Sequence, residues 1–241
     1  MKVTDIISDK INRLPVGYVF TYNDFNTKAE NIEALTKALG RMVKDGRLRK
    51  LSPGRFYKPR QSDFGELKPE VYQVVKDLLE QNGKIMGYLT GYSAYNELGL
   101  TSQVSNIIQV GTNELKKNIT RGLFKIRFIK QPNKITKKNI LLLRILDAIR
   151  FIKEIPGASI EQSCKTLIIL IKNLNKQDRI AFLRLAKKYN PAARALAGAI
   201  FEICFGKKSA DAVYKTLNPS SEYKIDISEN ILPNKQKWNI L

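Results

Sequence analysis

The chain has 241 residues, of which 43% are hydrophobic, so it is long enough for one or two domains and apolar enough to bury a core. Lysine and arginine outnumber aspartate and glutamate by 42 to 22, which gives a formal net charge of +20 and favours polyanionic partners. The absence of histidine excludes Ser-His-Asp and Cys-His catalysis and every His-ligated metal site.

Two helices are predicted in the first 30 residues. Apolar residues recur at three- and four-residue spacing over residues 1–14, which predicts an amphipathic helix. A second, short helix begins at Thr21, where Asp24 completes a variant of the capping box. Phe20 and Phe25 occupy the two positions of a hydrophobic staple around this start.

A third helix is predicted from about Asn31 to Asp45, followed by two short strands around a Pro-Gly turn. Residues 41–60 hold eight lysines and arginines, opposed only by Asp45. Three helices and a basic hairpin predict a winged helix-turn-helix domain over residues 1–60, whose third helix enters the major groove of double-stranded DNA. The alternative is an ordinary helix with a solvated, charged face in a lysine-rich chain. The predicted DNA-binding residues are Lys37, Arg41, Lys44, Arg47, Arg49, Lys50, Arg55 and Lys58.

The middle of the chain predicts a linker followed by a mixed domain. Residues 61–69 are the expected linker, and a helix follows from Pro69 to Leu79. A short helix is expected at about Tyr92–Leu98, and strands are expected at Ile107–Val110 and Lys125–Ile129.

From about Lys138 onward the pattern is helical. Residues 139–153 form one apolar-periodic stretch, and caps at Ser159 and Asn175 begin two further helices. Asn190-Pro191 starts the last long helix, which Gly206 closes. The predicted fold class is therefore α+β, mostly helical: a winged helix, then a domain at residues 70–217 with a small sheet and a helical C-terminal part. Residues 218–241 are expected to form a polar tail.

Two alternatives concern the larger domain. Tyr92, Tyr95 and Asn96 are candidates for a central pocket, although such tyrosines more often fill a core. A magnesium-dependent nuclease would need clustered carboxylates, and Glu114-Leu115-Lys116 is the only fragment of that kind, without an acid between Glu97 and Glu114. Four acids of the helical region, Asp147, Glu154, Glu161 and Glu202, are interpreted as caps or solvated side chains. We therefore expect no enzyme activity, no metal and no cofactor.

Three stretches of the chain resemble the AbiEi-like antitoxins of bacterial type IV toxin–antitoxin (abortive infection) systems. They are Leu39–Leu48, at and just after the end of the third helix, Leu51–Tyr57 in the wing, and the most distinctive, Leu89–Val104. The resemblance is specific over about residues 1–130 and extends to Gly206 only by general shape. It implies a bacterial repressor of its own operon, active in phage defence, that binds promoter repeats through the N-terminal domain. It also implies a neighbouring nucleotidyltransferase-like toxin that the C-terminal domain neutralises. A stand-alone winged-helix regulator, or an adaptor with a protein-binding C-terminal domain, remains the alternative.

The chain also carries signals for its compartment. Residues 1–10 are charged and have no apolar block, and the longest aliphatic run, Leu167–Ile171, is too short for a membrane span of ~18 residues. Cys164 and Cys204 match no metal or redox spacing and are interpreted as reduced, buried thiols. These features predict a cytoplasmic protein without membrane contact.

Overall fold

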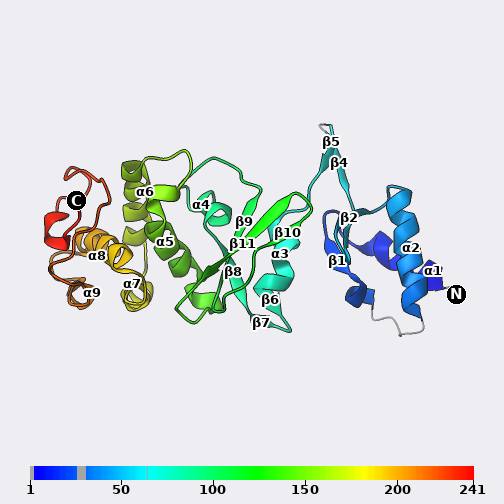
Figure 1. Ribbon diagram of the computed structural model, residues 1–241, viewed down its shortest axis with the longest axis horizontal. Helices are drawn as coiled ribbons and strands as arrows, with labels where there is room; N and C mark the ends of the chain where they lie inside the picture. Colours follow the sequence, from blue (N-terminus) through cyan, green and yellow to red (C-terminus); the bar gives the residue numbers. More distant parts are fainter. Residues whose placement is uncertain (1–2, 26–30, 64) are drawn as a thin grey trace. The chain divides into compact units, whose positions relative to one another are not determined.

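The computed structural model describes residues 3–25, 31–63 and 65–241 (Figure 1). Its fold is α+β with helices in the majority, small sheets and a helical C-terminal part, which confirms the predicted fold class. The chain divides into two compact units. The first contains Met1–Asp77 and Ile119–Lys125, and the second contains Leu78–Asn118 and Ile126–Leu241.

The first unit opens with two long helices and a three-stranded sheet. Its described elements are α1 (Val3–Arg13), β1 (Val19–Thr21), the 3-10 helix η1 (Tyr22–Phe25), α2 (Ile32–Lys44), β2 (Arg49–Ser52) and β3 (Arg55–Tyr57). The strands pair antiparallel in the order β1-β3-β2. Ile7 and Ile11 of α1 pack with Leu39 of α2 and with Phe20 and Phe56 of the sheet in one buried cluster.

The predicted start of the second helix is confirmed. The backbone N–H and the hydroxyl of Thr21 both donate to Asp24 Oδ2, at 2.7 and 2.9 Å. The rings of Phe20 and Phe25 meet edge to face at 5.7 Å, as a hydrophobic staple requires. The rest of this predicted helix falls on residues 26–30, outside the described part of the chain.

The predicted linker contains regular structure. Residues 61–69 hold most of a second antiparallel hairpin, formed by β4 (Arg60–Ser62) and β5 (Gly65–Leu67). The helix α3 (Val71–Leu79) follows it.

The first unit extends past the boundary predicted at residue 60 because α3 packs on its sheet. Gln73 accepts a hydrogen bond from the backbone N–H of Val19 at 3.3 Å. The ammonium of Lys76 lies 3.4 Å from the centre of the Tyr18 ring, a cation–π contact. α3 up to Asp77 therefore belongs with the first unit rather than with the larger domain.

A four-stranded sheet is formed by strands from the middle of the chain. Its strands are β8 (Gly87–Thr90), β9 (Ile107–Thr112), β10 (Ile119–Arg121) and β11 (Phe124–Lys130), in the order β10-β11-β9-β8. β9 and β11 confirm the two predicted strands, and a small hairpin of β6 (Glu80–Gln81) and β7 (Lys84–Ile85) precedes them. All four residues of β8 are buried, so the alternation that reveals a half-buried strand is missing and β8 was not predicted. The helix α4 (Tyr92–Tyr95) is shorter than expected.

Helices make up the rest of the second unit. They are η3 (Lys137–Asn139), α5 (Ile140–Arg150), η4 (Ile152–Glu154), α6 (Ile160–Lys172), α7 (Lys176–Ala186), α8 (Pro191–Phe205), α9 (Asp211–Tyr214) and η5 (Gln236–Trp238). α8 packs against α5, α6 and α7. The predicted helix starts at Ser159, Asn175 and Asn190 are confirmed, since each side-chain oxygen accepts a backbone N–H three residues on, at 3.1, 2.9 and 2.8 Å. None of the helices in the described ranges is long and apolar enough to cross a membrane.

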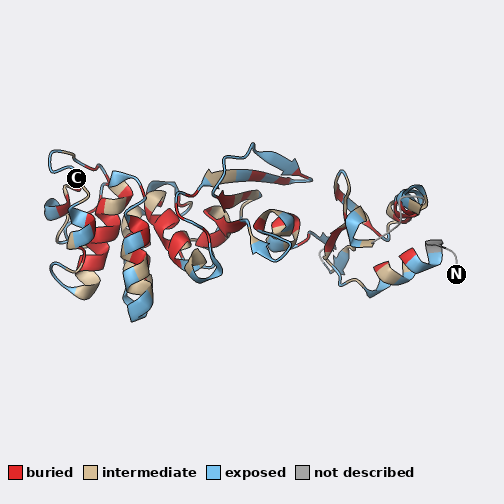
Figure 2. Ribbon diagram, turned by 90° about the horizontal axis from the view of Figure 1, so that it is seen from below, coloured by how far each residue is buried: buried red, intermediate tan, exposed pale blue. Residues whose placement is uncertain are grey.

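The segment 218–241, predicted as a polar tail, is instead built into the core of the second unit, where Figure 2 shows dense burial. Trp238 is 1% exposed and lies against Gly198, where a Cβ would come within 2.2 Å of the indole ring. Glu202 is buried as well and accepts hydrogen bonds from Trp238 Nε1 at 2.8 Å and Lys237 Nζ at 2.6 Å. Burial opposes its charge, but these donors hold the pKa of Glu202 below its ordinary value.

Asp147 of α5 also differs from the interpretation as a solvated acid. It is fully buried, and burial raises its pKa. Its carboxylate accepts hydrogen bonds from the hydroxyls of Tyr88, Thr90 and Tyr189, at 2.5, 2.6 and 2.8 Å. Gln131 donates to both tyrosine hydroxyls at 2.8 Å, so the carboxylate and both tyrosines are satisfied inside the protein.

Candidate nucleic-acid interface

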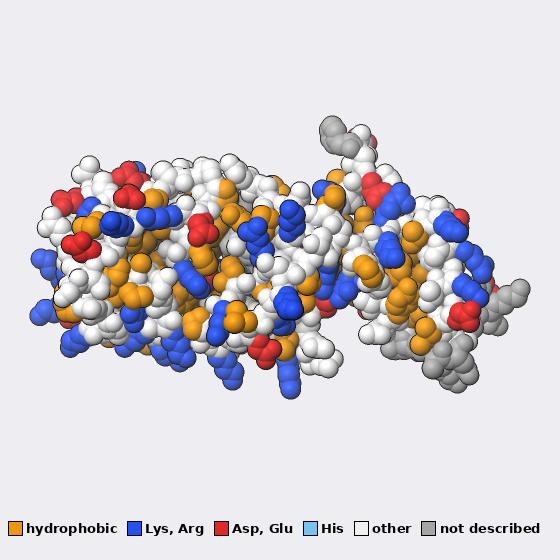
Figure 3. All heavy atoms as spheres, in the orientation of Figure 1, with side chains coloured by type: hydrophobic (Ala, Val, Ile, Leu, Met, Phe, Trp, Pro, Cys, Tyr) orange, Lys and Arg blue, Asp and Glu red, His pale blue; other side chains and the backbone are white. Residues whose placement is uncertain are grey.

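The exposed face of α2 forms because its apolar residues share the opposite side. Leu35, Ala38, Leu39 and Met42 are buried, and Gly46, at φ +74°, follows the helix end. Spacings of four and three residues place the predicted DNA-binding residues of this helix, Lys37, Arg41 and Lys44, together on the outward side. Figure 3 shows lysine and arginine side chains gathered along α2.

The three cations of α2 differ in what they contact. Lys37 pairs with Glu33 at 2.6 Å, but both side chains are largely exposed, so water and salt weaken this pair. The side chains of Arg41 and Lys44 are exposed and make no hydrogen bond or ion pair within the described part of the chain. Their charges are therefore available to an outside partner.

The wing is the hairpin of β2 and β3, which turns at Pro53 and Gly54. Gly54 has a φ of +72°, which suits glycine at this turn. Leu51 and Phe56 point into the unit, and Lys50 is exposed without a side-chain partner among the described residues. Among the described residues, Lys50 is thus a wing cation whose charge is available to an outside partner.

Arg55, a second cation expected to face outward on the wing, instead pairs with Asp77. Its guanidinium donates to Asp77 Oδ2 at 2.7 Å. The same carboxylate receives two hydrogen bonds from Arg121, at 2.6 and 2.8 Å, and Arg121 is nearly buried. Burial by itself would raise the pKa of Asp77, but the hydrogen bonds from the two arginines hold it below its ordinary value.

Arg49 is engaged in a similar way. Its Nε donates to Glu66 of the β4-β5 hairpin at 2.9 Å, and the Tyr57 hydroxyl donates to the same carboxylate at 3.3 Å. Burial and the negative charge of Glu66 raise the pKa of Tyr57. The second hairpin therefore braces the wing.

Arg47 and Lys58, the last two predicted residues, meet at Asn12 of α1. Arg47 donates to the side-chain oxygen of Asn12 at 3.2 Å, and Lys58 donates to its backbone carbonyl at 3.1 Å. Of the eight predicted residues, Arg41, Lys44 and Lys50 have no side-chain partner in the described part of the chain, and Lys37 is in an exposed pair. Sequence reasoning missed the partners of the other four, because Asn12, Glu66 and Asp77 lie 17 to 46 residues away from them and carry no motif.

The predicted central pocket is a different matter. Tyr95 is 2% exposed and belongs to the large core cluster, Tyr92 packs edge to face on it at 6.1 Å, and Asn96 is exposed. Neither of the two cavities described for this chain is lined by these residues. Their placement follows the core-filling alternative rather than a pocket.

Glu114, the candidate nuclease acid, lies on an exposed segment after β9. Its backbone carbonyl accepts a hydrogen bond from Thr112 at 2.7 Å. Within residues 3–25, 31–63 and 65–241, no group of three or more acidic or cysteine side chains is placed to hold a metal ion.

Comparison with known proteins gives a family and a fold. Residues 6–180 match the model of a family described as "Family of unknown function (DUF6088)". No curated protein matches the sequence. The crystal structure of the RV2827C protein from Mycobacterium tuberculosis is similar, with a TM-score of 0.52 and 13% identity over 90% of this chain and 82% of that chain. At this identity the similarity concerns the fold alone.

Proposed function

We propose that this chain, which belongs to the DUF6088 family of unknown function, is a DNA-binding antitoxin and the transcriptional autorepressor of a type IV toxin–antitoxin operon. In this proposal the first unit is a winged helix that binds promoter repeats in double-stranded DNA. The second unit neutralises a nucleotidyltransferase-like toxin.

The observation that carries the DNA-binding part is the outward face of α2, on which Arg41 and Lys44 are exposed and unpaired among the described residues. A helix of this kind enters the major groove, where arginine can donate two hydrogen bonds to guanine and lysine can contact phosphate. The element order α1-β1-η1-α2-β2-β3 and the sheet order β1-β3-β2 fit a winged helix. Lys50 on the wing would then contact the phosphate backbone beside the groove.

Gly40 adds a second supporting feature. It lies on the exposed side of α2 between Lys37 and Arg41, and a Cβ placed there would have no neighbouring protein atom within 4 Å. Glycine inside a helix costs about 0.5–1 kcal/mol relative to alanine, and no contact within the unit offsets this cost. Because glycine has no side chain, a DNA backbone could approach the helix closely at this position.

The antitoxin part rests on the resemblance of Leu39–Leu48, Leu51–Tyr57 and Leu89–Val104 to AbiEi-like antitoxins. The third of these stretches includes the end of β8, the turn at Gly91 and the helix α4. The second unit has its own core of α5, α6 and α8, so a partner can bind it without involving the DNA-binding face.

The deciding experiment compares Arg41→Ala with a matched control, Arg13→Ala, in the full-length protein. Arg13 is also an exposed arginine, at the end of α1, and within the described residues it pairs with Asp9. Binding to duplex DNA from the chain's own promoter would be measured by fluorescence anisotropy at several salt concentrations. Arg41→Ala should lose ~1–3 kcal/mol of specific binding, and Arg13→Ala should lose little.

The same two variants would be tested in cells that express the neighbouring gene. We expect Arg41→Ala to release the promoter from repression but still to protect against the toxin. Protection without any promoter binding by the wild type would indicate an adaptor. Promoter binding without a toxic neighbour would indicate a stand-alone regulator. Failure of the wild-type protein to bind DNA at low salt would refute the winged-helix assignment.

A further inference from the structure

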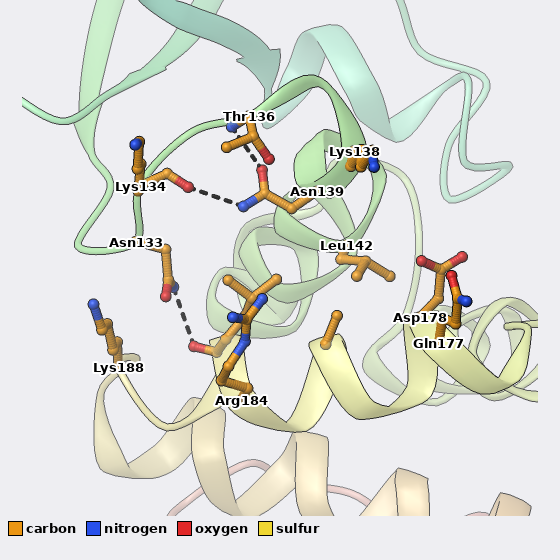
Figure 4. A pocket seen from close by; sticks show the side chains of 12 residues that line it. Asn133, Lys134, Thr136, Lys138, Asn139, Leu142, Gln177, Asp178, Arg184 and Lys188 are labelled. Carbon is orange, nitrogen blue, oxygen red and sulfur yellow. Dashed lines mark hydrogen bonds between the residues drawn. The ribbon is translucent and has the colours of Figure 1, made fainter.

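The second unit contains a cavity of about 440 Å³ that the proposed DNA interface does not use. Figure 4 shows its two walls: one is formed by the segment of residues 133–142, and the other by residues 177–188, which comprise most of α7 and the turn after it. The volume is within the range of sites that bind small molecules, roughly 300–1,000 Å³.

Positive charge dominates the lining. The side chains of Lys134 and Lys138 come from the first wall, Arg184 comes from α7, and Lys188 comes from the turn that follows this helix. None of these four cations forms an ion pair or a side-chain hydrogen bond within the described residues. The single carboxylate of the lining, Asp178, is occupied by the side-chain amide of Asn175 at 2.6 Å.

Four exposed, unpaired cations around one hollow give it a positive potential, which favours an anion there. A concave, low-dielectric wall also concentrates their field inside the cavity. Arg184 extends into the cavity from α7 in Figure 4, and its planar guanidinium offers five N–H donors in a geometry that matches phosphate oxygens. The lining therefore suits clustered negative charge better than a single carboxylate.

The walls are fixed before any ligand arrives. Asn133 joins them by donating to the Leu185 carbonyl at 3.1 Å. Asn139 accepts from the Thr136 N–H and donates to the Lys134 carbonyl, both at 2.9 Å, so the loop that carries two of the cations is closed on itself. A preformed site saves the cost of ordering these groups on binding.

The lining is not wholly polar. Leu142 and Leu185 are buried in the core and present apolar surface beside the cations. A ligand with a charged end and a flat, less polar end would contact both kinds of surface. Nucleotides have this construction.

We infer that this cavity binds the phosphate groups of a free nucleoside di- or triphosphate, with Arg184 and Lys188 on one side of the phosphates and Lys134 and Lys138 on the other. This site is independent of the DNA-binding face of the first unit. It gives the second unit a small-molecule ligand in addition to any protein partner.

The test is isothermal titration of the full-length protein with ATP, with pyrophosphate and with adenosine. ATP and pyrophosphate should bind saturably and adenosine should bind far more weakly. Arg184→Gln should weaken ATP binding by roughly 10- to 100-fold, because it removes charge-assisted hydrogen bonds to the phosphates. The matched control is Lys187→Gln, which removes the same charge from an exposed neighbour outside the cavity and should change binding less than twofold.

Two further measurements test whether the DNA-binding face is the ATP site and whether the phosphates of an oligonucleotide are the preferred ligand. A double variant, Arg41→Ala with Lys44→Ala, should still bind ATP, which excludes the DNA-binding face as the site. In that variant, short single-stranded and duplex oligonucleotides should displace labelled ATP poorly. Displacement by oligonucleotides at lower concentrations than ATP, equal effects of Arg184→Gln and Lys187→Gln, or no saturable binding of ATP and pyrophosphate would each overturn the inference. Thermal unfolding of every variant verifies that it is folded.

Discussion

Replacing Asp77 by asparagine should destabilise the first unit and not the second. Asp77 accepts two hydrogen bonds from Arg121 and one from Arg55, and the Arg121 side chain is only 5% exposed. Asp77→Asn keeps the size of the side chain but leaves a buried guanidinium without its counter-charge. The Val74 carbonyl, at 2.6 Å, then remains as the other acceptor of Arg121.

The size of the effect follows from these exposures. Removing one partner of a fully buried ion pair costs ~3–5 kcal/mol. The Asp77 side chain is 41% exposed, so water can replace part of the lost interaction. We expect a loss of about 2–3 kcal/mol in the free energy of unfolding of the first unit at pH 7.

The pH dependence gives an independent check. Because the pKa of Asp77 is lowered in the folded state, its contribution is fully present above the unfolded value of about 3.9 and is lost as the pH falls through the folded value. The difference between wild type and Asp77→Asn should therefore be constant between pH 6 and 8 and shrink towards zero in strong acid.

Hydrogen exchange of the β2-β3 hairpin and α3 would measure the stability of the first unit, and the fluorescence of Trp238 would report on the second unit. The control is Glu33→Gln, which breaks the exposed pair with Lys37 and should change stability by less than about 0.5 kcal/mol. Exchange in Asp77→Asn that equals the wild type at pH 7, or a difference that persists undiminished in strong acid, would refute the reasoning.

Three other predictions follow from single contacts. Arg55→Ala should lower the stability of the first unit by about 1 kcal/mol but weaken DNA binding less than Lys50→Ala does, because Arg55 is bound to Asp77 while Lys50 is free. Anisotropy titrations that rank the two variants in the opposite order would contradict this. Gly198→Ala should destabilise the second unit by about 1–3 kcal/mol and alter Trp238 fluorescence, since the added Cβ meets the indole at 2.2 Å. Gly40→Ala, in open space on α2, should instead be stabilising. Equal melting temperatures for the two variants would contradict the close packing of Trp238 on Gly198. Burial, and to a lesser extent the nearby Cys204, raises the pKa of Cys164 to about 12. A thiol reagent at pH 8 should therefore label the half-buried Cys204 first. Peptide mapping that finds Cys164 labelled at the same rate would disprove this.

The division into units decides whether the two proposed activities should be separated with truncated fragments or with point variants. A cut after residue 62 would split the first unit, because residues 63–77 and Ile119–Lys125 belong to it. Arg121, which lies in the returning segment, supplies the buried partner of Asp77. Point variants of α2 in the full chain are therefore a cleaner test than fragments.

Local chemistry made much of the helical framework readable from the sequence. The start of η1 at Thr21 and the helix starts at Ser159, Asn175 and Asn190 depend on residues one to four positions apart, and all of them occur in the structure. The exposed face of α2 followed from the 3.6-residue period in the same way. Such features involve no distant part of the chain, so a single sequence is sufficient to predict them.

Tertiary structure alone decided which charges are free and which polar residues are buried. Arg55 contacts Asp77, 22 residues later, and Asp77 contacts Arg121, a further 44 residues later. The sequence therefore could not show that Arg55 is paired while Lys50 is not. The cations at residues 134–138 and 184–188 converge on one cavity only because α5 and α7 pack together. The polar composition of residues 218–241 hid a buried tryptophan, since Trp238 is held by Glu202 and Gly198 about 40 residues earlier. Pairings of this kind depend on which surfaces meet when the chain folds, and no local pattern records them.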